Sequence, residues 1–443
     1  MTTLTRRNFV VALGAPIAAG VMRQGAPAGE LRVDAASLRR RIEELSVFGR
    51  PAGGSFANGV SRVSYTDADI HGRAYVMNLM RSAGLVPRID PAGNIFARRE
   101  GTDAGLPPIL FGSHIDSVPS GGNFDGDLGS LAALGAIEAC TAASLATRHP
   151  LEMVIWAHEE GVAYNRGLAG SRIAAGDIEP AHLDQVWNGL RRADAIRKIG
   201  GDPDRIMQAR RDKRSHHCYL ELHIEQGGNL DRSRIPIGVV EGIVSIERHE
   251  AEIIGFANHA GTTPMDQRQD AMIAAAQLAL TVREVVTESA GSQVGTVGQI
   301  AIEPNAPNVV PGVARLVIEL RDLSTTKLDG LSAKIRTRAD EIARTTKTRI
   351  DIRRVSRNLP AAASSDVQVA IERASKTLRL PTTRMPSGAG HDAQSMAQLG
   401  PMGMIFVPSV GGISHSPKEL TSWDDCANGA NVLLQAILEM DRA

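Results

Sequence analysis

The stretch PPILFGSHID (107–116) sets the pattern on which the rest of the chain builds. Two prolines lead into a short apolar run, and the run ends in His114 and Asp116. A short apolar run bounded by turn residues and ending in polar ones predicts a buried strand. The same arrangement recurs in LEMVIWAHEE (151–160), YLELHIEQG (219–227) and MGMIFVPS (402–409).

Helix-like stretches such as 130–144 and 193–200 lie between these predicted strands. The alternation predicts an α/β fold with a mostly parallel central sheet. In such sheets function gathers at the carboxyl ends of the strands. Here those ends carry His114, the pair Glu159–Glu160, and His223.

Residues 238–356 follow a different pattern, and 443 residues are long enough for two domains. The predicted order is β-α-β-β-α-β, a split ferredoxin-like arrangement. The first of these strands is expected over 239–256. We therefore expect one domain built from 29–237 and 357–443, with a compact second domain of 238–356 inserted into it.

The charge balance and the aromatic content of the chain bear on which partners it could bind. Lys plus Arg and Asp plus Glu are 49 each, and aromatic residues are 3%. Balanced charge and few aromatic residues give no reason to expect nucleic acid or an anionic membrane. Three scattered cysteines make neither a disulfide framework nor a cysteine zinc site.

The N-terminus, MTTLTRRNFVVALGAPIAAGVMRQGAPAGE, has the layout of an export signal. Arg6 and Arg7 precede a short apolar stretch, and Ala26-Pro27-Ala28 resembles a cleavage site. The paired arginines resemble a twin-arginine signal over residues 1–28, which predicts a periplasmic or exported protein. The alternatives are a disordered tail or an uncleaved anchor, and a cytoplasmic protein. The apolar stretch is too short to predict a membrane span.

The polar residues at the strand ends are each ambiguous alone. A lone His is more often a hydrogen-bonding residue than a ligand, and Asp125, in NFDGDLG, has the glycine neighbours of a turn. Taken together, however, histidines and carboxylates at the ends of buried strands are the ligand set of a divalent transition metal. His415, in GISHSPKE, adds a further histidine near the C-terminus.

Five motifs in this order resemble the hydantoinase/carbamoylase family: GSHIDSVPSGGNFDGDLGSLAAL, AHEEGVAYNRGLAGSR, ELHIEQGGNL, HAGTTPM and SHSPKE. The family includes N-carbamoyl-L-amino-acid hydrolases and allantoate amidohydrolases, and belongs to the clan of dinuclear-zinc aminoacylases and carboxypeptidases. The match runs from about residue 35 to the C-terminus. The Gly228-Asn229 pair stands where the family often has a proline.

The resemblance implies two divalent metal ions, Zn²⁺ first, with Mn²⁺, Co²⁺ or Ni²⁺ as alternatives. It implies that Asp125 bridges the ions and that Glu159 is the general base. Asp116 would orient His114. Asp127 has no place in this pattern, so Asp127→Asn is expected to lose little metal or activity. The remaining implied ligands are His114 and His223 for one ion, and Glu160 and His415 for the other.

The resemblance also implies a set of substrate residues for a small-molecule ureido acid. Arg321 would bind its carboxylate, and His259 would polarise its carbonyl. The inserted domain would act as a lid and form a homodimer, in which His259 or its neighbours could reach the partner subunit's site. The implied substrate residues are Gln226, His259, Asn308, Arg321, Gly390 and His391.

The sequence thus predicts a binuclear amidohydrolase that cleaves the ureido C–N bond of an N-carbamoyl-L-amino acid or a similar ureido acid. An allantoate amidohydrolase is the nearest alternative. An aminoacylase or peptidase of the same clan is a second, although ELHIEQG argues against it. A non-catalytic binding protein of the same fold is a third, but it would predict a broken ligand set.

Overall fold

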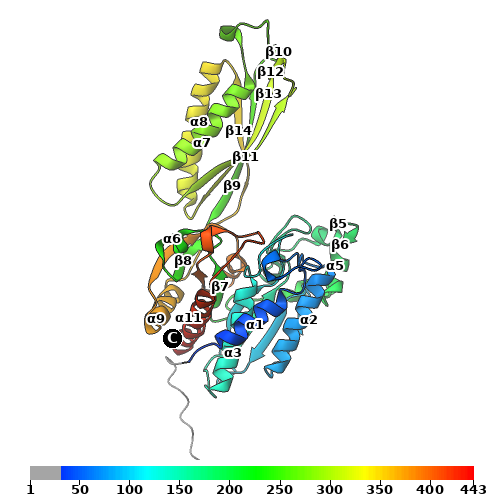
Figure 1. Cartoon of the computed structure of the whole chain (residues 1–443), viewed down its shortest axis with the longest axis vertical. Coiled ribbons are helices and arrows are strands. Elements are labelled where there is room, and N and C mark those ends of the chain that lie inside the picture. The colour runs from blue at the N-terminus through cyan, green and yellow to red at the C-terminus, as the bar shows by residue number, and fades with distance from the viewer. Residues whose placement is uncertain (1–30) are drawn as a thin grey trace, which may run out of the picture.

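The computed structural model describes residues 31–443, so the predicted export signal lies outside the described residues. Within the described part, no helix is long and apolar enough to cross a membrane. The described chain forms a larger α/β unit and a smaller unit that extends from it (Figure 1).

A nine-stranded mixed sheet is the centre of the larger unit. The pairs β4–β3, β3–β7 and β7–β17 are parallel, so the expected parallel sheet is found at its centre. The strands β1, β2 and β15 pair antiparallel, and β8 pairs antiparallel with β17 but parallel with β16. The strands are β1 (Arg88–Ile89), β2 (Ile95–Arg99), β3 (Ile109–His114), β4 (Leu151–Trp156), β7 (Tyr219–Ile224), β8 (Ile237–Ile243), β15 (Ala361–Ala362), β16 (Thr382–Ser387) and β17 (Met402–Val407).

Helices cover both faces of this sheet because successive strand side chains point to opposite sides and both sides are apolar. In β3, Ile109 and Phe111 join one buried cluster, whereas Leu110 joins the other. The first cluster is covered by α1 (Ala35–Leu45), α2 (Asp67–Ser82), α3 (Asp127–Ala142), α9 (Ser365–Thr377) and α11 (Trp423–Arg442). The second is covered by α4 (Ala169–Ala174) and α10 (Asp392–Met396).

The smaller unit is an antiparallel four-stranded sheet in the order β11-β13-β9-β14. Its elements follow one another as β-α-β-β-α-β, so the predicted ferredoxin-like order is confirmed. Its own apolar core lies between the sheet and two helices. These elements are β9 (Ser245–Ile254), α7 (Ala271–Glu288), β11 (Val294–Glu303), β13 (Val313–Asp322), α8 (Thr325–Thr346) and β14 (Arg349–Arg357).

The strand expected over 239–256 is two strands. β8 belongs to the large sheet and β9 to the small one, and the chain passes between them at Val244. The predicted boundary at 238 therefore falls inside β8. The apolar residues of β8 and β9 form one continuous run in the sequence. Because both cores bury the same residue types, the run does not show where one strand ends and the next sheet begins.

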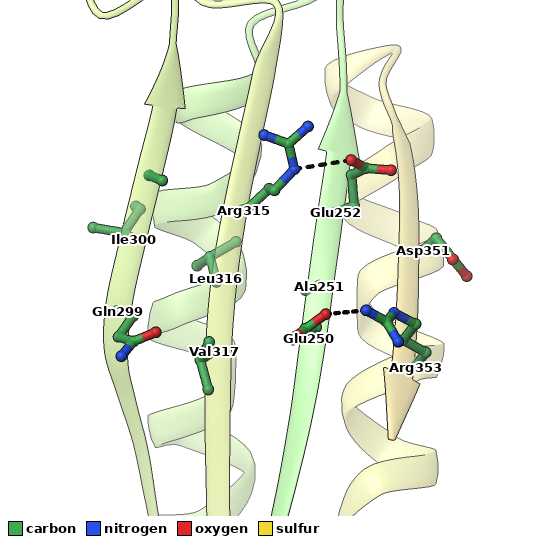
Figure 2. A pocket seen from close by; sticks show the side chains of 11 residues that line it. Glu250, Ala251, Glu252, Gln299, Ile300, Arg315, Leu316, Val317, Asp351 and Arg353 are labelled. Carbon is green, nitrogen blue, oxygen red and sulfur yellow. Dashed lines mark hydrogen bonds and ion pairs between the residues drawn. The ribbon is translucent and has the colours of Figure 1, made fainter. Parts of the chain in front are cut away.

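The other face of the small sheet carries charged side chains. Because α7 and α8 lie on one side, residues of β9 alternate between the apolar core and this uncovered face. Figure 2 shows Arg315 of β13 donating to Glu252 of β9 (3.0 Å) and Arg353 of β14 paired with Glu250. These pairs bridge neighbouring strands across a shallow cavity of about 540 Å³.

Two short strands, β10 (Asn258–His259) and β12 (Val309–Val310), pair at one end of the smaller unit. This end, which we call the tip, points away from the larger unit (Figure 1).

Candidate metal centre

The parallel strands bring the predicted ligands to one edge of the large sheet. β3 lies between β4 and β7, so the carboxyl ends of these three strands are adjacent. His114 is the last residue of β3, His223 lies one residue before the end of β7, and Glu159 and Glu160 follow β4. All four side chains are buried or nearly so.

Asp125 lies between two groups of ligands. Its Oδ1 is 3.4 Å from His114 Nε2 and 3.2 Å from His223 Nε2. Its Oδ2 is 3.4 Å from His415 Nε2, and the same His415 nitrogen is 3.4 Å from Glu160 Oε2. The two oxygens of one carboxylate therefore face different sets of donors.

These separations fit metal coordination. Donor atoms about 2.1 Å from a common ion in tetrahedral geometry stand about 3.4 Å apart. Two groups, His114–Asp125–His223 and Asp125–Glu160–His415, each hold their donor atoms within 4.8 Å of one another and share Asp125. In addition, Glu160 Oε1 is buried and has no hydrogen-bond partner. The residues present thus suit two divalent ions bridged by one carboxylate.

Hydrogen bonds set the tautomers of the two buried histidines. A carbonyl oxygen only accepts, so His114 Nδ1 donates to Asp116 O (3.0 Å) and His223 Nδ1 donates to Ile224 O (2.9 Å). Both Nε2 atoms are turned towards Asp125. Burial lowers the pKa of each ring, but the neighbouring carboxylates raise it above the usual value, so in the metal-free site Nε2 carries the proton that a metal displaces. Once neutral, an imidazole fixed in this way is prepared to bind a metal.

Asp116 supports both strand ends at once. Its carboxylate accepts from the backbone N–H of Glu159 (3.1 Å) and of Glu160 (3.2 Å), and from the Ser64 hydroxyl (2.6 Å). Through its own carbonyl it also orients His114. This is a wider positioning role than the one predicted from sequence.

Gly126 lets Asp125 approach His114. It has φ +68°, and a Cβ there would lie 2.4 Å from the His114 ring. Any side chain at this position would push the imidazole away from Asp125. The glycine next to the carboxylate is therefore part of the site's geometry and not only of a turn.

Glu159, the first of the two acidic residues after β4, has a raised pKa and lies beside the ligand group. Burial raises the pKa of Glu159 well above its ordinary value, and Glu160 beside it raises it further. Glu159 Oε2 is 3.9 Å from His114 Nε2, so its carboxylate stands next to the ligand group. A carboxyl group in this place can take a proton from a water held by the ligand group and return it.

Three of the predicted substrate residues in the larger unit lie near the ligands or at the edge of the cleft between the units. Gln226 donates to Asp125 Oδ2 (2.7 Å), and the His391 ring is 4.5 Å from the His223 ring. Burial and His223 lower the pKa of His391 well below its usual value, so it is neutral. Gly390 lines a cavity of about 900 Å³ between the units.

The predicted substrate residues of the insert fall at opposite ends of it. Arg321 donates to Gly388 O (2.6 Å), so it touches the loop that carries Gly390. His259 and Asn308 sit at the tip, where Ala260 N–H donates to Asn308 O (2.9 Å). The fold brings these two together but holds them away from their own chain's ligands (Figure 1).

Sequence reasoning missed Glu419, the last residue of the SHSPKE motif. It is buried, and its Oε1 accepts from the backbone N–H of Phe124 (3.0 Å) and Asp125 (3.1 Å). The Ser414 hydroxyl lies 2.8 Å from Glu419 Oε2 and 3.1 Å from Asp125 Oδ2. Glu419 thus ties the loop of Asp125 to the loop of His415. Its position four residues after His415, within the same motif, could have indicated a role near the ligands.

Asp127 has a structural role that the sequence did not reveal, and the expectation that Asp127→Asn loses little metal or activity stays a prediction. Asp127 is buried and paired with Arg62, which is also buried. Arg62 additionally donates to the carbonyl oxygens of Ile115 (2.5 Å), Leu45 (2.9 Å) and Phe48 (2.9 Å). Removing one charge of a buried pair leaves the other uncompensated.

A mixed α/β unit with two donor groups sharing a carboxylate at its strand ends defines a metal-dependent hydrolase. Residues 110–439 match the model of Peptidase family M20/M25/M40, and the chain belongs to this family. It is 40% identical over 404 residues to an N-carbamoyl-L-amino acid amidohydrolase of Geobacillus stearothermophilus, covering 91% of this chain and 98% of that protein. It is 37% identical over 415 residues to a ureidoglycolate hydrolase of Arabidopsis thaliana, covering 92% and 86%.

Solved structures agree with this placement. A hydantoinase/carbamoylase family amidase from Burkholderia multivorans superimposes with a TM-score of 0.85 at 32% identity, covering 93% of this chain and 99% of that one. An aminopeptidase PepT from Bacillus cereus, at 16% identity and a TM-score of 0.61, shares the fold alone. The resemblance inferred from the motifs is therefore confirmed, and the chain is a hydrolase acting on amide C–N bonds.

Proposed function

We propose that this chain hydrolyses the ureido C–N bond of an N-carbamoyl-L-amino acid or a similar ureido acid, releasing ammonia and carbon dioxide. The observation that carries the proposal is the placement of Asp125, with one oxygen on each ligand group and Glu159 beside them. Its 40% identity to an N-carbamoyl-L-amino acid amidohydrolase supports the choice of substrate class.

We assign the metal-binding roles as the motifs imply. His114 and His223 would hold one ion, Glu160 and His415 the other, and Asp125 would bridge them. Bound divalent ions supply a water of lowered pKa and polarise the carbonyl. The mixed nitrogen and oxygen donors suit Zn²⁺, and Mn²⁺, Co²⁺ and Ni²⁺ remain candidates.

Glu159 is proposed as the general base and acid. Its carboxylate takes a proton from the attacking water and delivers it to the leaving nitrogen. Its neighbour Asp116 holds the backbone of Glu159 and Glu160 in place (3.1 and 3.2 Å), so the carboxylate does not need to reorganise during the reaction.

The remaining polar residues would bind the substrate. Arg321 suits the carboxylate of a ureido acid, since a guanidinium binds it bidentately. His259 Nδ1 accepts from the backbone N–H of Gly261 (3.0 Å) and Thr262 (3.2 Å), so its proton sits on Nε2. That N–H is a suitable donor to a developing oxyanion. Asn308, Gln226, Gly390 and His391 are proposed to complete the substrate site.

We propose that a second copy of the chain supplies the tip. His259 and Asn308 lie at the tip, away from the ligands of their own chain, so a homodimer would let them reach the partner's site (Figure 1). The strand β11 supports this, because β13 is its one neighbour among the described strands. It also exposes Val294 and Ile300. A long edge of this kind, whose one charged residue is Glu303 at its end, favours pairing with another chain.

The test is a substrate panel. Purified protein loaded with Zn²⁺ or Mn²⁺ is incubated with N-carbamoyl-L-amino acids, allantoate, ureidoglycolate, N-acetyl amino acids and dipeptides, and ammonia and free amino acid are measured. We expect ammonia from ureido acids. Hydrolysis of dipeptides with no reaction of any ureido acid would overturn the proposal. Ureidoglycolate is the second candidate because of the 37% identity to a ureidoglycolate hydrolase.

Glu159→Gln is the control for catalysis. It keeps the shape of the side chain but cannot accept the proton, so activity should be lost while metal content stays. Unchanged activity in this variant would contradict the assigned mechanism and leave the fold assignment intact.

We also propose that residues 1–28 direct export by a twin-arginine route. The test is a fusion of this segment to a reporter protein, with Arg6 and Arg7 replaced by lysine as the control. Retention of the reporter in the cytoplasm by both versions would contradict export.

A further inference from the structure

The cavity of about 900 Å³ between the two units begins beside the proposed catalytic residues. Leu168 lines it, and the backbone N–H of Leu168 donates to the carbonyl oxygen of Glu159 (2.7 Å). Gly390 lines it as well, next to His391, whose ring packs against the ring of His223. A substrate bound at the ligand groups would therefore extend into this cavity.

Arg248 of β9 lines the cavity from the side of the insert. Its Nε donates to Glu319 Oε2 (2.7 Å), and its side chain is half-exposed. Within residues 31–443 its two terminal nitrogens make no hydrogen bond. The N–H groups of a guanidinium form a fork that matches the two oxygens of a carboxylate. The free edge of Arg248 is therefore suited to an acidic group in the cavity.

Arg172 of α4 lines the same cavity from the side of the larger unit. Its Nε donates to Asp177 Oδ2 (2.8 Å), and its terminal nitrogens make no hydrogen bond in the described part of the chain. Asp177 also accepts from Arg166 (2.9 Å), so this carboxylate is shared between two guanidinium groups. The cavity thus has a guanidinium edge from each unit.

Arg248 lies beside Arg321, the residue proposed to bind the carboxylate of a ureido acid. Both side chains are on the uncovered face of the small sheet, and both bind Glu319. Arg321 donates to Glu319 Oε1 from Nε (2.8 Å) and from Nη2 (2.6 Å), whereas Arg248 uses Oε2. The two guanidinium groups are therefore separated by one carboxylate, and a ligand with two acidic groups a few bonds apart would reach both.

An acidic group suits this cavity better than a neutral or a basic one. Among the described residues that line it, Asp177 is the one carboxylate, and it is already engaged. Closing the units over a neutral side chain would remove water from the guanidinium edges without replacing its hydrogen bonds, which costs free energy. A basic side chain would add charge repulsion.

We propose that Arg248, together with Arg172, binds a second acidic group of the substrate. The inference rests on the proposed function and narrows its substrate class to N-carbamoyl-L-amino acids with an acidic side chain. The ureido group would lie at the ligand groups, the α-carboxylate at Arg321 and the side-chain carboxylate at Arg248. Arg248 is then a specificity residue and takes no part in bond cleavage.

The test compares acidic substrates with neutral substrates of the same shape. The metal-loaded protein is assayed with N-carbamoyl-L-aspartate against N-carbamoyl-L-asparagine, and with N-carbamoyl-L-glutamate against N-carbamoyl-L-glutamine. We expect kcat/KM to be about tenfold or more higher for the acid of at least one pair, because the acid adds hydrogen bonds between charged groups. Arg248→Gln should bring this ratio close to one, and Arg172→Gln should lower it.

Arg315→Gln is the matched control. Arg315 lies on the same face of the same sheet, but it pairs with Glu252 and Glu303 and does not line the cavity between the units (Figure 2). This variant should keep the preference for the acid. A preference lost equally in Arg315→Gln would mean a general charge effect and would overturn the inference.

Equal kcat/KM values for acid and amide, or a preference that survives in Arg248→Gln, would also overturn the inference. Both results leave the proposed function intact, because the ureido acids are still hydrolysed. If none of the four substrates and no other ureido acid releases ammonia, the proposed function fails and the inference fails with it.

Discussion

The strand-end ligand groups and the tip of the insert carry two parts of one proposed site. They differ in whether a single chain brings their residues close to the ligands. The donors of each ligand group come from separate segments and converge to within 4.8 Å. At the tip, His259 and Asn308 are adjacent to each other but far from those ligands (Figure 1). One chain therefore brings the donor groups together but keeps His259 and Asn308 apart from them, and under the proposed function a motion of the insert or another copy would have to bring the tip to a ligand group.

The largest effect is expected at the residue that joins the two ligand groups. Asp125→Asn should lower kcat/KM by about 10³-fold or more and reduce bound metal, because both groups lose a charged donor. Metal analysis and the ammonia assay measure this.

Asp127→Asn is the matched control two residues away. It should lower the free energy of unfolding by about 3 kcal/mol, because Arg62 is left unpaired in the interior. Its folded protein should still bind metal as the unmodified protein does. Loss of metal from folded Asp127→Asn would place Asp127 among the ligands.

His259→Ala tests the role of the tip. We expect kcat/KM to fall by about 10²–10³-fold, because one donor to the oxyanion is lost. Metal content and the unfolding midpoint should stay unchanged, because His259 is exposed and distant from the ligands. A fall in metal content would mean that His259 contributes to metal binding, in contradiction to its assigned role as a donor to the oxyanion.

Glu419→Gln should weaken metal binding by about 10–100-fold, since the loops of Asp125 and His415 lose a shared charged acceptor. Competition with a chelator measures this. The adjacent exposed Lys418→Gln is the control and should leave the affinity unchanged. Equal affinities in the two variants would show that Glu419 only packs.

The smallest effect is the pH dependence of metal uptake. In the metal-free site, burial and Asp125 raise the pKa of Glu160 to about 8, and Asp125 raises that of His415 to about 9. Both groups are then protonated at pH 7 and must lose protons to bind metal. Uptake should release protons, and affinity should rise with pH by about tenfold per unit for each proton. Calorimetry in buffers of different ionisation enthalpy checks this, and no proton release would contradict it.

The sequence predicted what local patterns determine. His114, His223, Glu159 and Glu160 follow apolar strands, and parallel strands bring such ends to one edge of a sheet. The ferredoxin-like order of the insert followed from its alternation of strands and helices.

Other features depend on long-range contacts that no local pattern contains. The boundary at 238 failed because β8 and β9 form one apolar run that two sheets divide. The Arg62–Asp127 pair joins residues 65 apart in sequence, and Glu419 accepts from Asp125 across 294 residues. Motif matching likewise placed His259 and Asn308 in the substrate site without showing that they lie at the far end of the insert.

Complementation between two inactive variants tests the central claim most directly. Glu159→Gln lacks the base but keeps its tip, and His259→Ala lacks the tip histidine but keeps its base. If the tip serves a partner copy, mixing and re-associating the two in equal amounts should restore about a quarter of the unmodified activity, from one intact site in each mixed dimer. Activity no higher than the sum of the two separate variants would contradict the account and place His259 in the site of its own chain.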